Sequence, residues 1–265
     1  MAMRRKQHIL AVIILLAGSR SFAGGDGKGV SEKEVGRLRH LACIMDGNRR
    51  WAKRQGKPQH DGHREGANAV CRVIDACAEH HIDQLSLYAF SLENFKRSEI
   101  EKRFIFDLLV KGAQGLYVEC QGRGARMRFI GDRSLFPQDV IETCQELEKE
   151  TAAFKAMQVN LLFGYGAQQE MLSAFKRAVA DAQSGKLEAS DVSQETLEQY
   201  LWTVGTPPPD LILRTGGDRR QSNFLLYQAA YSELCFLDCL WPDMGKQQMD
   251  SVIADFYARK RNFGA

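Results

Sequence analysis

Short runs of apolar residues alternate with amphipathic segments over most of the chain. Each run is bounded by polar or glycine-rich residues, as expected for strands that are buried on both faces of a sheet. We expect strands at 41–45, 85–90, 126–130, 159–163, 211–213 and 234–237. Between most of them apolar residues recur with a helical period, which predicts helices at 62–81, 98–120, 138–153, 167–183, 194–202 and 246–261.

This alternation predicts a single α/β domain. Strands that take turns with helices favour a mainly parallel central sheet flanked by helices on both faces, with right-handed crossover connections. Parallel sheets bind ligands at the carboxyl ends of their strands. The residues that directly follow each strand should therefore carry the function.

The N-terminal residues follow a different pattern. A basic segment at 4–6 precedes an apolar run at 9–17, and a small-x-small triplet follows at 21–23, an order that resembles a signal peptide. The apolar run is shorter than the roughly 20 residues that cross a bilayer, and a membrane-touching tail or an inert extension would explain it equally well. A glycine-rich linker follows at 24–29. We therefore divide the chain into an extension at 1–30 and a folded domain at 31–265.

Composition narrows the classes of function. A chain with 44% hydrophobic and 26% charged residues is ordinary for a globular protein, which excludes disordered, collagen-like and coiled-coil classes. A net charge of +3 is too small to indicate a nucleic-acid partner. The seven cysteines include no C-x-x-C pair, so we interpret them as buried thiols of a reducing, cytoplasmic compartment and not as zinc ligands.

The segment after the first strand suits a phosphate group. It reads Asp46-Gly47-Asn48-Arg49-Arg50-Trp51. Glycine permits close approach of the backbone, and the forked guanidinium groups of arginine match phosphate oxygens. The carboxylate beside them fits if Mg²⁺ bridges it to the phosphate. In the alternative interpretation, Asp46 only caps a helix and the arginines are solvated.

Two further strands end in polar segments. Residues 91–97 (SLENFKR) precede Ser98 and Glu101, which together form the pattern of a capping box. Residues 214–223 (RTGGDRRQSN) offer two glycines, three arginines and two hydroxyl groups, a composition that suits a second phosphate site, although a solvated turn is the plainer alternative. Two such sites on one sheet edge indicate two phosphorylated substrates.

At this point the sequence resembles a known family. Residues 40–52 (HLACIMDGNRRWA) resemble the first motif of the cis-prenyltransferases, which are the undecaprenyl and dehydrodolichyl diphosphate synthases. Residues 88–95 (YAFSLENF) resemble the second motif, and 210–226 with 231–234 and 241–243 resemble the third. The motifs occur in order and extend over about 38–263, nearly the whole expected domain.

The resemblance implies a role for each matching residue. It implies Asp46 and Asn94 as catalytic residues, and Asp46 with Glu233 as ligands of Mg²⁺. Because an amide is a poor base, we expect Asn94 to orient a substrate and not to remove a proton unaided. The implied substrate-binding residues are Gly47, Asn48, Arg49, Arg50, Trp51, His63, Ser91, Leu92, Glu93, Phe95, Arg97, Arg214, Arg220, Gln221 and Ser222.

The chain departs from the family pattern at two places. Gln59 stands where the family often has an arginine, and Phe95 stands where it commonly has a tryptophan. The first change removes a charged phosphate contact, for which Arg64 is the candidate replacement, and the second keeps an aromatic wall.

The implied activity is prenyl transfer. An allylic diphosphate, with farnesyl diphosphate as the expected primer, loses its diphosphate and is attacked by the double bond of isopentenyl diphosphate. A proton then leaves, the new double bond is cis, and repeated cycles build a long-chain polyprenyl diphosphate such as undecaprenyl diphosphate. The resemblance also implies a homodimer.

A growing prenyl chain should lie in an apolar environment, because each buried methylene contributes about 0.8 kcal/mol. We expect an elongated hydrophobic tunnel walled by the helices at 62–81 and 98–120, with Val159, Leu161 and Phe163 at its floor. An apolar opening of this tunnel, together with the basic N-terminal segment, predicts peripheral contact with anionic membranes.

Other functions fit the sequence less well. A trans-prenyltransferase needs D-D-x-x-D motifs, and the chain contains no adjacent pair of aspartates. A non-catalytic accessory subunit of a synthase, or a polyprenyl-phosphate-binding protein without turnover, is the alternative to the enzyme. Such relatives typically lose the aspartate of the first motif, whereas this chain retains Asp46.

Overall fold

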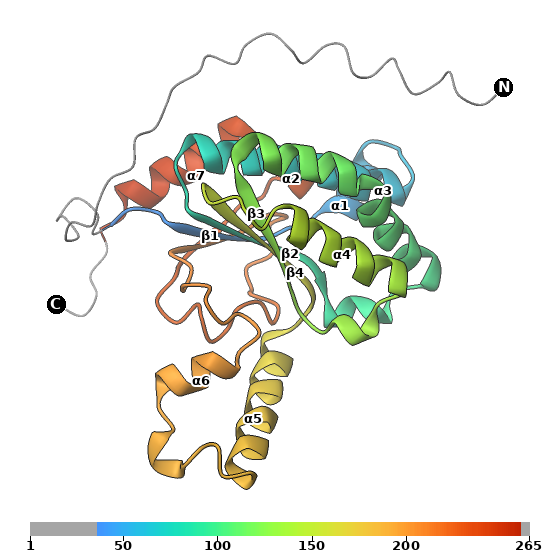
Figure 1. The fold of residues 1–265 in the computed structure, drawn as a ribbon. Coiled ribbons are helices and arrows are strands. Elements are labelled where there is room, and N and C mark those ends of the chain that lie inside the picture. Colours follow the sequence, from blue (N-terminus) through green and yellow to red (C-terminus); the bar gives the residue numbers. More distant parts are fainter. Residues whose placement is uncertain (1–35, 261–265) are drawn as a thin grey trace. The chain divides into compact units, whose positions relative to one another are not determined.

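The computed structural model describes residues 36–260, so the expectations for the extension at 1–30 lie outside the described residues. The described residues form a single α/β domain around one six-stranded, all-parallel sheet (Figure 1). The strand order is β3-β4-β2-β1-β5-β6. Within these residues no helix is long and apolar enough to cross a membrane.

The predicted strands and helices are confirmed, with shifted ends. The strands are β1 (His40–Ile44), β2 (Gln84–Ser91), β3 (Ala125–Ile130), β4 (Met157–Tyr165), β5 (Leu211–Arg214) and β6 (Glu233–Phe236). The helices are α1 (Asn48–Arg54), α2 (Gln59–Glu79), α3 (Glu99–Arg123), α4 (Gln138–Glu150), α5 (Ala167–Gln183), α6 (Gln194–Tyr200) and α7 (Lys246–Ala258). The short helix α1 is an addition to the predicted set.

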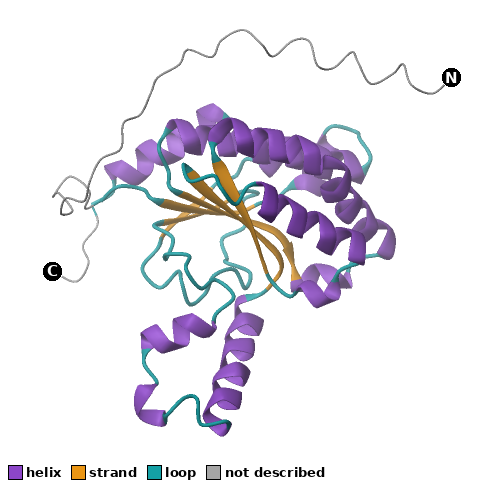
Figure 2. Cartoon of the chain, viewed as in Figure 1, coloured by secondary structure: helices purple, strands orange, loops and turns teal. Residues whose placement is uncertain are grey.

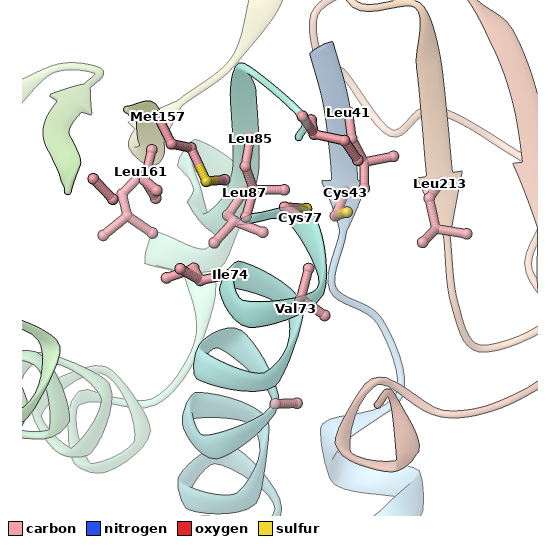
Figure 3. Packing of buried hydrophobic residues seen from close by; sticks show 14 of the residues in the cluster. Leu41, Cys43, Val73, Ile74, Cys77, Leu85, Leu87, Met157, Leu161 and Leu213 are labelled. Atoms are coloured by element: carbon pink, nitrogen blue, oxygen red, sulfur yellow. The ribbon is translucent and has the colours of Figure 1, made fainter. Parts of the chain in front are cut away.

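The strands are apolar throughout because both faces of the sheet are covered. Successive residues of β1 alternate between two hydrophobic clusters: Leu41 and Cys43 belong to one, and Ala42 and Ile44 to the other. Figure 3 shows the larger cluster, in which α2 lays its apolar side against β1, β2 and β4.

The helices are divided unevenly between the two faces. α2, α3, α4 and α7 lie on one face, whereas loops and turns lie against much of the other, with α5 and α6 extending from it (Figure 2). The strand order accounts for α5 and α6, because after β4 the chain passes to the opposite side of β1 to add β5 and β6, and a right-handed crossover in that direction places its helices on the opposite face. The β3–α4–β4 connection runs in that same direction, yet α4 packs on the first face beside α3, so this connection departs from the expected right-handed crossover.

A buried carboxylate anchors this second face. Glu170, on the first turn of α5, is fully buried. It accepts hydrogen bonds from the hydroxyl of Tyr165 at 2.5 Å, from the amide and hydroxyl of Thr203 at 2.8 Å each, and from Nε2 of Gln228 at 3.0 Å. These four bonds join the end of β4, the segment after α6 and the segment before β6.

Candidate active site

The three polar segments meet at one edge of the sheet. β1 lies between β2 and β5, and the register pairs Ile44 with both Tyr88 and Arg214. The direction in which strands are added reverses at β1, and open parallel sheets bind ligands at such a reversal, beyond the carboxyl ends of the strands. The crevice beside Asp46 is therefore where a ligand is expected.

Asp46 is held between two arginines. Its Oδ2 accepts a hydrogen bond from Nη2 of Arg214 at 2.8 Å, and its Oδ1 lies 3.2 Å from Nη2 of Arg50. Partial burial would raise the pKa of Asp46, but the bond and charge of Arg214, followed by those of Arg50, bring the pKa below its ordinary value. The carboxyl group is therefore ionised at neutral pH.

Arg214 connects this carboxylate to the loop that follows β5. The residue is buried, with 3% of its surface exposed. Its Nη1 donates to the hydroxyl of Ser222 at 2.7 Å and to the carbonyl oxygen of Arg220 at 2.5 Å. Arg214 thus holds the loop in place through these bonds, and the Arg220 side chain of that loop lies at the surface.

Asp218 is a member of the site that the sequence interpretation missed. Its carboxylate pairs with Arg220 at 3.0 Å and lies 3.5 Å from Arg214 and 3.8 Å from Arg50. Asp46 and Asp218 therefore both lie between the two predicted phosphate sites, which form a single basic centre. The available signal was an acidic residue inside a segment of three arginines.

A second group of polar residues lies where α2 and α3 begin. Oε1 of Glu101 lies 3.3 Å from Nε2 of His63 and accepts a bond from Arg97 at 3.0 Å. Burial, and then the charge of Arg97, lower the pKa of His63 in spite of Glu101, and the charge of Arg49 acts in the same direction. The structure therefore brings together three residues assigned to the allylic diphosphate.

Glu101 itself has a role that differs from the predicted one. Ser98 does cap α3, because its hydroxyl accepts from the amide of Glu101 at 3.3 Å. The Glu101 carboxylate, however, binds His63 and Arg97. A capping box and an ion-pair network use the same residue spacing, so the sequence did not distinguish them.

The segment after β2 orders Asn94. The Oδ1 atom of Asn94 accepts from the amide of Ser91 at 3.1 Å, in a reciprocal capping arrangement that also holds the adjoining Leu92. This bond engages the carbonyl oxygen of Asn94 and not its amide nitrogen. Glu93 accepts from Asn223 at 3.0 Å, which ties the segment to the loop after β5, where Gln221 also lies.

Aromatic packing fixes Phe95 beside the site. Its ring lies 5.0 Å from that of Phe90, edge to face, and 5.4 Å from that of Phe136. Phe106 and Phe163 complete a cluster of five phenylalanines. Phe95 is therefore part of a packed aromatic cluster.

Two predicted residues lie elsewhere. Nε1 of Trp51 donates to Asp243 at 2.9 Å, so this ring joins α1 to the segment before α7. Glu233 is the first residue of β6, where the register aligns it with Leu211 at the start of β5, and it pairs with Arg259 at 3.0 Å. Because the strands are parallel, Glu233 lies at the opposite edge of the sheet from Asp46. The predicted pairing of these carboxylates on one Mg²⁺ therefore does not form within this chain.

An apolar cavity of about 410 Å³ opens beside the polar residues. Asn48, His63 and Arg64 lie at its polar end, and α2, α3 and the strands β3 and β4 line the remainder. Leu161 and Phe163, expected at the floor of a tunnel, line this cavity. Val159 is fully buried in the core. The chain therefore combines a cationic centre with an adjoining apolar cavity.

Comparison with known proteins assigns the family. Residues 44–264 match the family model described as putative undecaprenyl diphosphate synthase. The chain belongs to the cis-prenyltransferase family. The structure brings together the same polar segments that suggested this family in the sequence. The family model covers all of these motifs except the first residues of β1.

Individual cis-prenyltransferases resemble the chain over most of its length. A ditrans,polycis-undecaprenyl-diphosphate synthase, farnesyl-diphosphate specific, from Pseudomonas aeruginosa is 40% identical over 88% of this chain and 93% of its own. A tritrans,polycis-undecaprenyl-diphosphate synthase, geranylgeranyl-diphosphate specific, from Pyrococcus abyssi is 40% identical over 85% and 86%. The crystal structure of lavandulyl diphosphate synthase from Lavandula x intermedia, in complex with dimethylallyl diphosphate, superimposes with a TM-score of 0.83 at 31% identity, covering 86% of this chain and 99% of that one.

Proposed function

We propose that this protein is a Mg²⁺-dependent cis-prenyltransferase that condenses isopentenyl diphosphate onto an allylic diphosphate and releases a long-chain polyprenyl diphosphate. The observation that carries the proposal is the junction of a basic centre with an apolar cavity. A diphosphate group needs the basic centre, and a prenyl chain needs the apolar cavity. The family assignment and the names of the relatives support the same reaction.

The allylic diphosphate binds at the polar end of the cavity. Arg49, His63 and Arg97 interact electrostatically there; Gly47 precedes α1, and Arg50 lies in its first turn. From this position the prenyl chain enters the cavity between α2 and α3. The relatives named for farnesyl and for geranylgeranyl diphosphate are both consistent with an allylic primer.

Isopentenyl diphosphate binds on the loop after β5. Arg220 is exposed there, and the hydroxyl of Ser222 is fixed by Arg214. Asp218 neutralises Arg220 in the free protein, so a diphosphate must replace this carboxylate as the partner of the guanidinium.

The residues fit a Mg²⁺ ion held mainly by substrate. Asp46 is ionised and partly exposed at the crevice, and Mg²⁺ commonly takes one or two carboxylates together with phosphate oxygens. No group of three or more His, Cys, Asp or Glu side chains gathers as a metal site among residues 36–260. When bound, Mg²⁺ would stabilise the charge of the departing diphosphate.

In the reaction, the bond between the allylic carbon and its diphosphate breaks, and a carbon–carbon bond forms from the double bond of isopentenyl diphosphate. A proton leaves the condensing unit, which restores a double bond. The basic side chains hold both diphosphates in place, and Asn94 orients the condensing unit through its amide nitrogen. The packed phenylalanines exclude water from the reacting carbons.

We further propose that two copies of the chain associate through α5. Leu172, Phe175 and Val179 are exposed on one side of this helix, at 52%, 65% and 38%. Exposed apolar stripes of this kind mark interaction sites. Light scattering should give the mass of a dimer for the wild type, and Phe175→Glu should shift the protein toward the monomer. A dimeric mass for both would exclude α5 as the interface.

Membrane contact is a separate proposal. In a flotation experiment with anionic liposomes, the full chain should float with the vesicles, whereas a chain that begins at Ser31 should not. Equal flotation of both would exclude 1–30 as the anchor.

Incubation with radiolabelled isopentenyl diphosphate, farnesyl diphosphate and Mg²⁺ tests the activity. The wild type should form butanol-extractable product that is longer than farnesyl after dephosphorylation. A folded protein that binds both substrates and forms no product would refute the proposed enzymatic activity. That result would favour a polyprenyl-phosphate-binding protein or an accessory subunit.

A further inference from the structure

Three glycines of α3, Gly112, Gly115 and Gly122, lack any packing reason to be glycine. Glycine is among the least favourable residues in the interior of a helix. On α2, Gly62 and Gly66 are explained by the close approach of α1, because a Cβ atom at either position would overlap Asn48. A Cβ atom at Gly112 or Gly115 would meet no atom within 4 Å.

Gly112 and Gly115 both line the apolar cavity. They are three residues apart, so they lie on one side of α3 about one turn from each other. Both are exposed. The missing side chains therefore leave space in the cavity itself.

The paths of α2 and α3 explain why the cavity lies here. The two helices are joined near one end by His63 and Glu101, 3.3 Å apart, and near the other by Asp75 and Arg123. At 1.5 Å per residue, α2 rises about 18 Å between these contacts and α3 about 33 Å. α3 takes the longer path and is bent (Figure 1). Gly112 is midway between its two contacts, where the helices have room to separate.

We propose that Gly112 and Gly115 determine how long the polyprenyl product becomes, because the growing chain passes over them. This inference rests on the proposed function. The chain starts at the polar end beside His63, and residue numbers on α3 increase away from that end. A growing chain therefore reaches Gly112 before Gly115, about 4.5 Å further along the helix, which is close to the length that one isoprenyl unit adds.

Bulky apolar substitutions test the proposal. Gly112→Leu and Gly115→Leu should each shorten the main product by at least one isoprenyl unit, with the shorter product from Gly112→Leu. Gly112→Ala should leave the length unchanged or shorten it less. The matched control is Gly122→Leu, because Gly122 is on the same helix with equally open space but does not line the cavity. Products are dephosphorylated and separated by reversed-phase chromatography.

The outcomes separate this inference from the proposed function. A wild type without product would refute the function. An active wild type with unchanged product length in both cavity variants would refute the role of the glycines. A thermal unfolding curve and the rate of the first condensation are measured for each variant. If Gly122→Leu shortens the product as much as the cavity variants, the effect comes from helix stiffness and the proposal is wrong.

Discussion

Replacing Asp46 by alanine should reduce turnover far more than it reduces stability. The 2.8 Å bond from Arg214 is charge-assisted, and such bonds contribute about 1.5–3 kcal/mol. The Asp46 side chain is 30% exposed, and Arg214 keeps Ser222 and Asp218 as partners, so we reduce this to about 1–2 kcal/mol. The half-exposed Arg50 pair adds less than about 1 kcal/mol.

Domains of this size are typically stable by about 5–15 kcal/mol, so nearly all Asp46→Ala molecules should remain folded. Their kcat should nevertheless fall by about 10²–10³-fold, the loss typical of removing one preorganised charge from an active site. Urea denaturation gives the first quantity, and steady-state incorporation of radiolabelled isopentenyl diphosphate at saturating Mg²⁺ gives the second. Asp46→Asn, which keeps the shape, serves as the matched variant.

Near-wild-type turnover of Asp46→Ala would refute its role in leaving-group departure. A turnover loss that tracks the fraction unfolded would show a purely structural role. An unchanged free energy of unfolding would instead refute the stabilising contribution assigned to the bond with Arg214.

Three further predictions concern other residues. Arg220→Ala should raise the KM for isopentenyl diphosphate about 10–100-fold and that for the allylic substrate much less, because it removes one charge-assisted contact; initial rates at varied substrate measure both. Gly62→Ala should lower the free energy of unfolding by about 1–3 kcal/mol in urea, because its Cβ atom would overlap Asn48. His40 is buried, which lowers its pKa although Pro207 and Asp210 oppose the shift. The unfolded chain therefore binds more protons below pH 6.5, so the free energy of unfolding should fall there by up to about 1.4 kcal/mol per pH unit, and His40→Gln should reduce this slope.

Each of these has its own control. Arg219→Ala removes the same charge one residue away, and an equal KM change in both variants would show a general field effect. Gly122→Ala adds the same methyl group to open space and should be neutral or stabilising. His63 also has a lowered pKa, so His63→Gln tells how much of the slope belongs to that residue. Identical slopes in the wild type and His40→Gln would contradict the burial argument.

The apolar runs were sufficient to predict the sheet. Strands that are buried on both faces form uninterrupted runs of apolar residues, so the ends of β1 and β5 were clear from the sequence. The helix α1, of only seven residues, is too short to show a period. The strand order was not readable from the pattern, because it depends on which edges pair in three dimensions. The placement of α5 and α6 on the second face follows from that order, whereas that of α4 does not.

The site was predictable where a strand end fixed it. Asp46 lies just after β1, and Arg214 is the last residue of the neighbouring β5. The correct fold class was therefore enough to predict that they meet. Asp218 and Glu101 each pair with a nearby arginine, Arg220 and Arg97, but their place in the site depends on partners from distant segments, Arg50 and His63. Glu233 was assigned by motif alone, and the parallel register places it at the far edge of the sheet.

The hydrogen bonds of Glu170 have a consequence for how the molecule opens. Four directional bonds to one carboxylate hold the segments around Thr203 and Gln228 in place, whereas α2 is held by a broad apolar contact. Regions secured by few contacts open and exchange their amide protons first. The loop with Arg220 and Ser222 lies between those segments, so bound isopentenyl diphosphate should slow exchange over 216–223 more than in α2. Each new isoprenyl unit would thus bind on a loop held by directional bonds, and the chain being extended would lie against helices held by apolar packing.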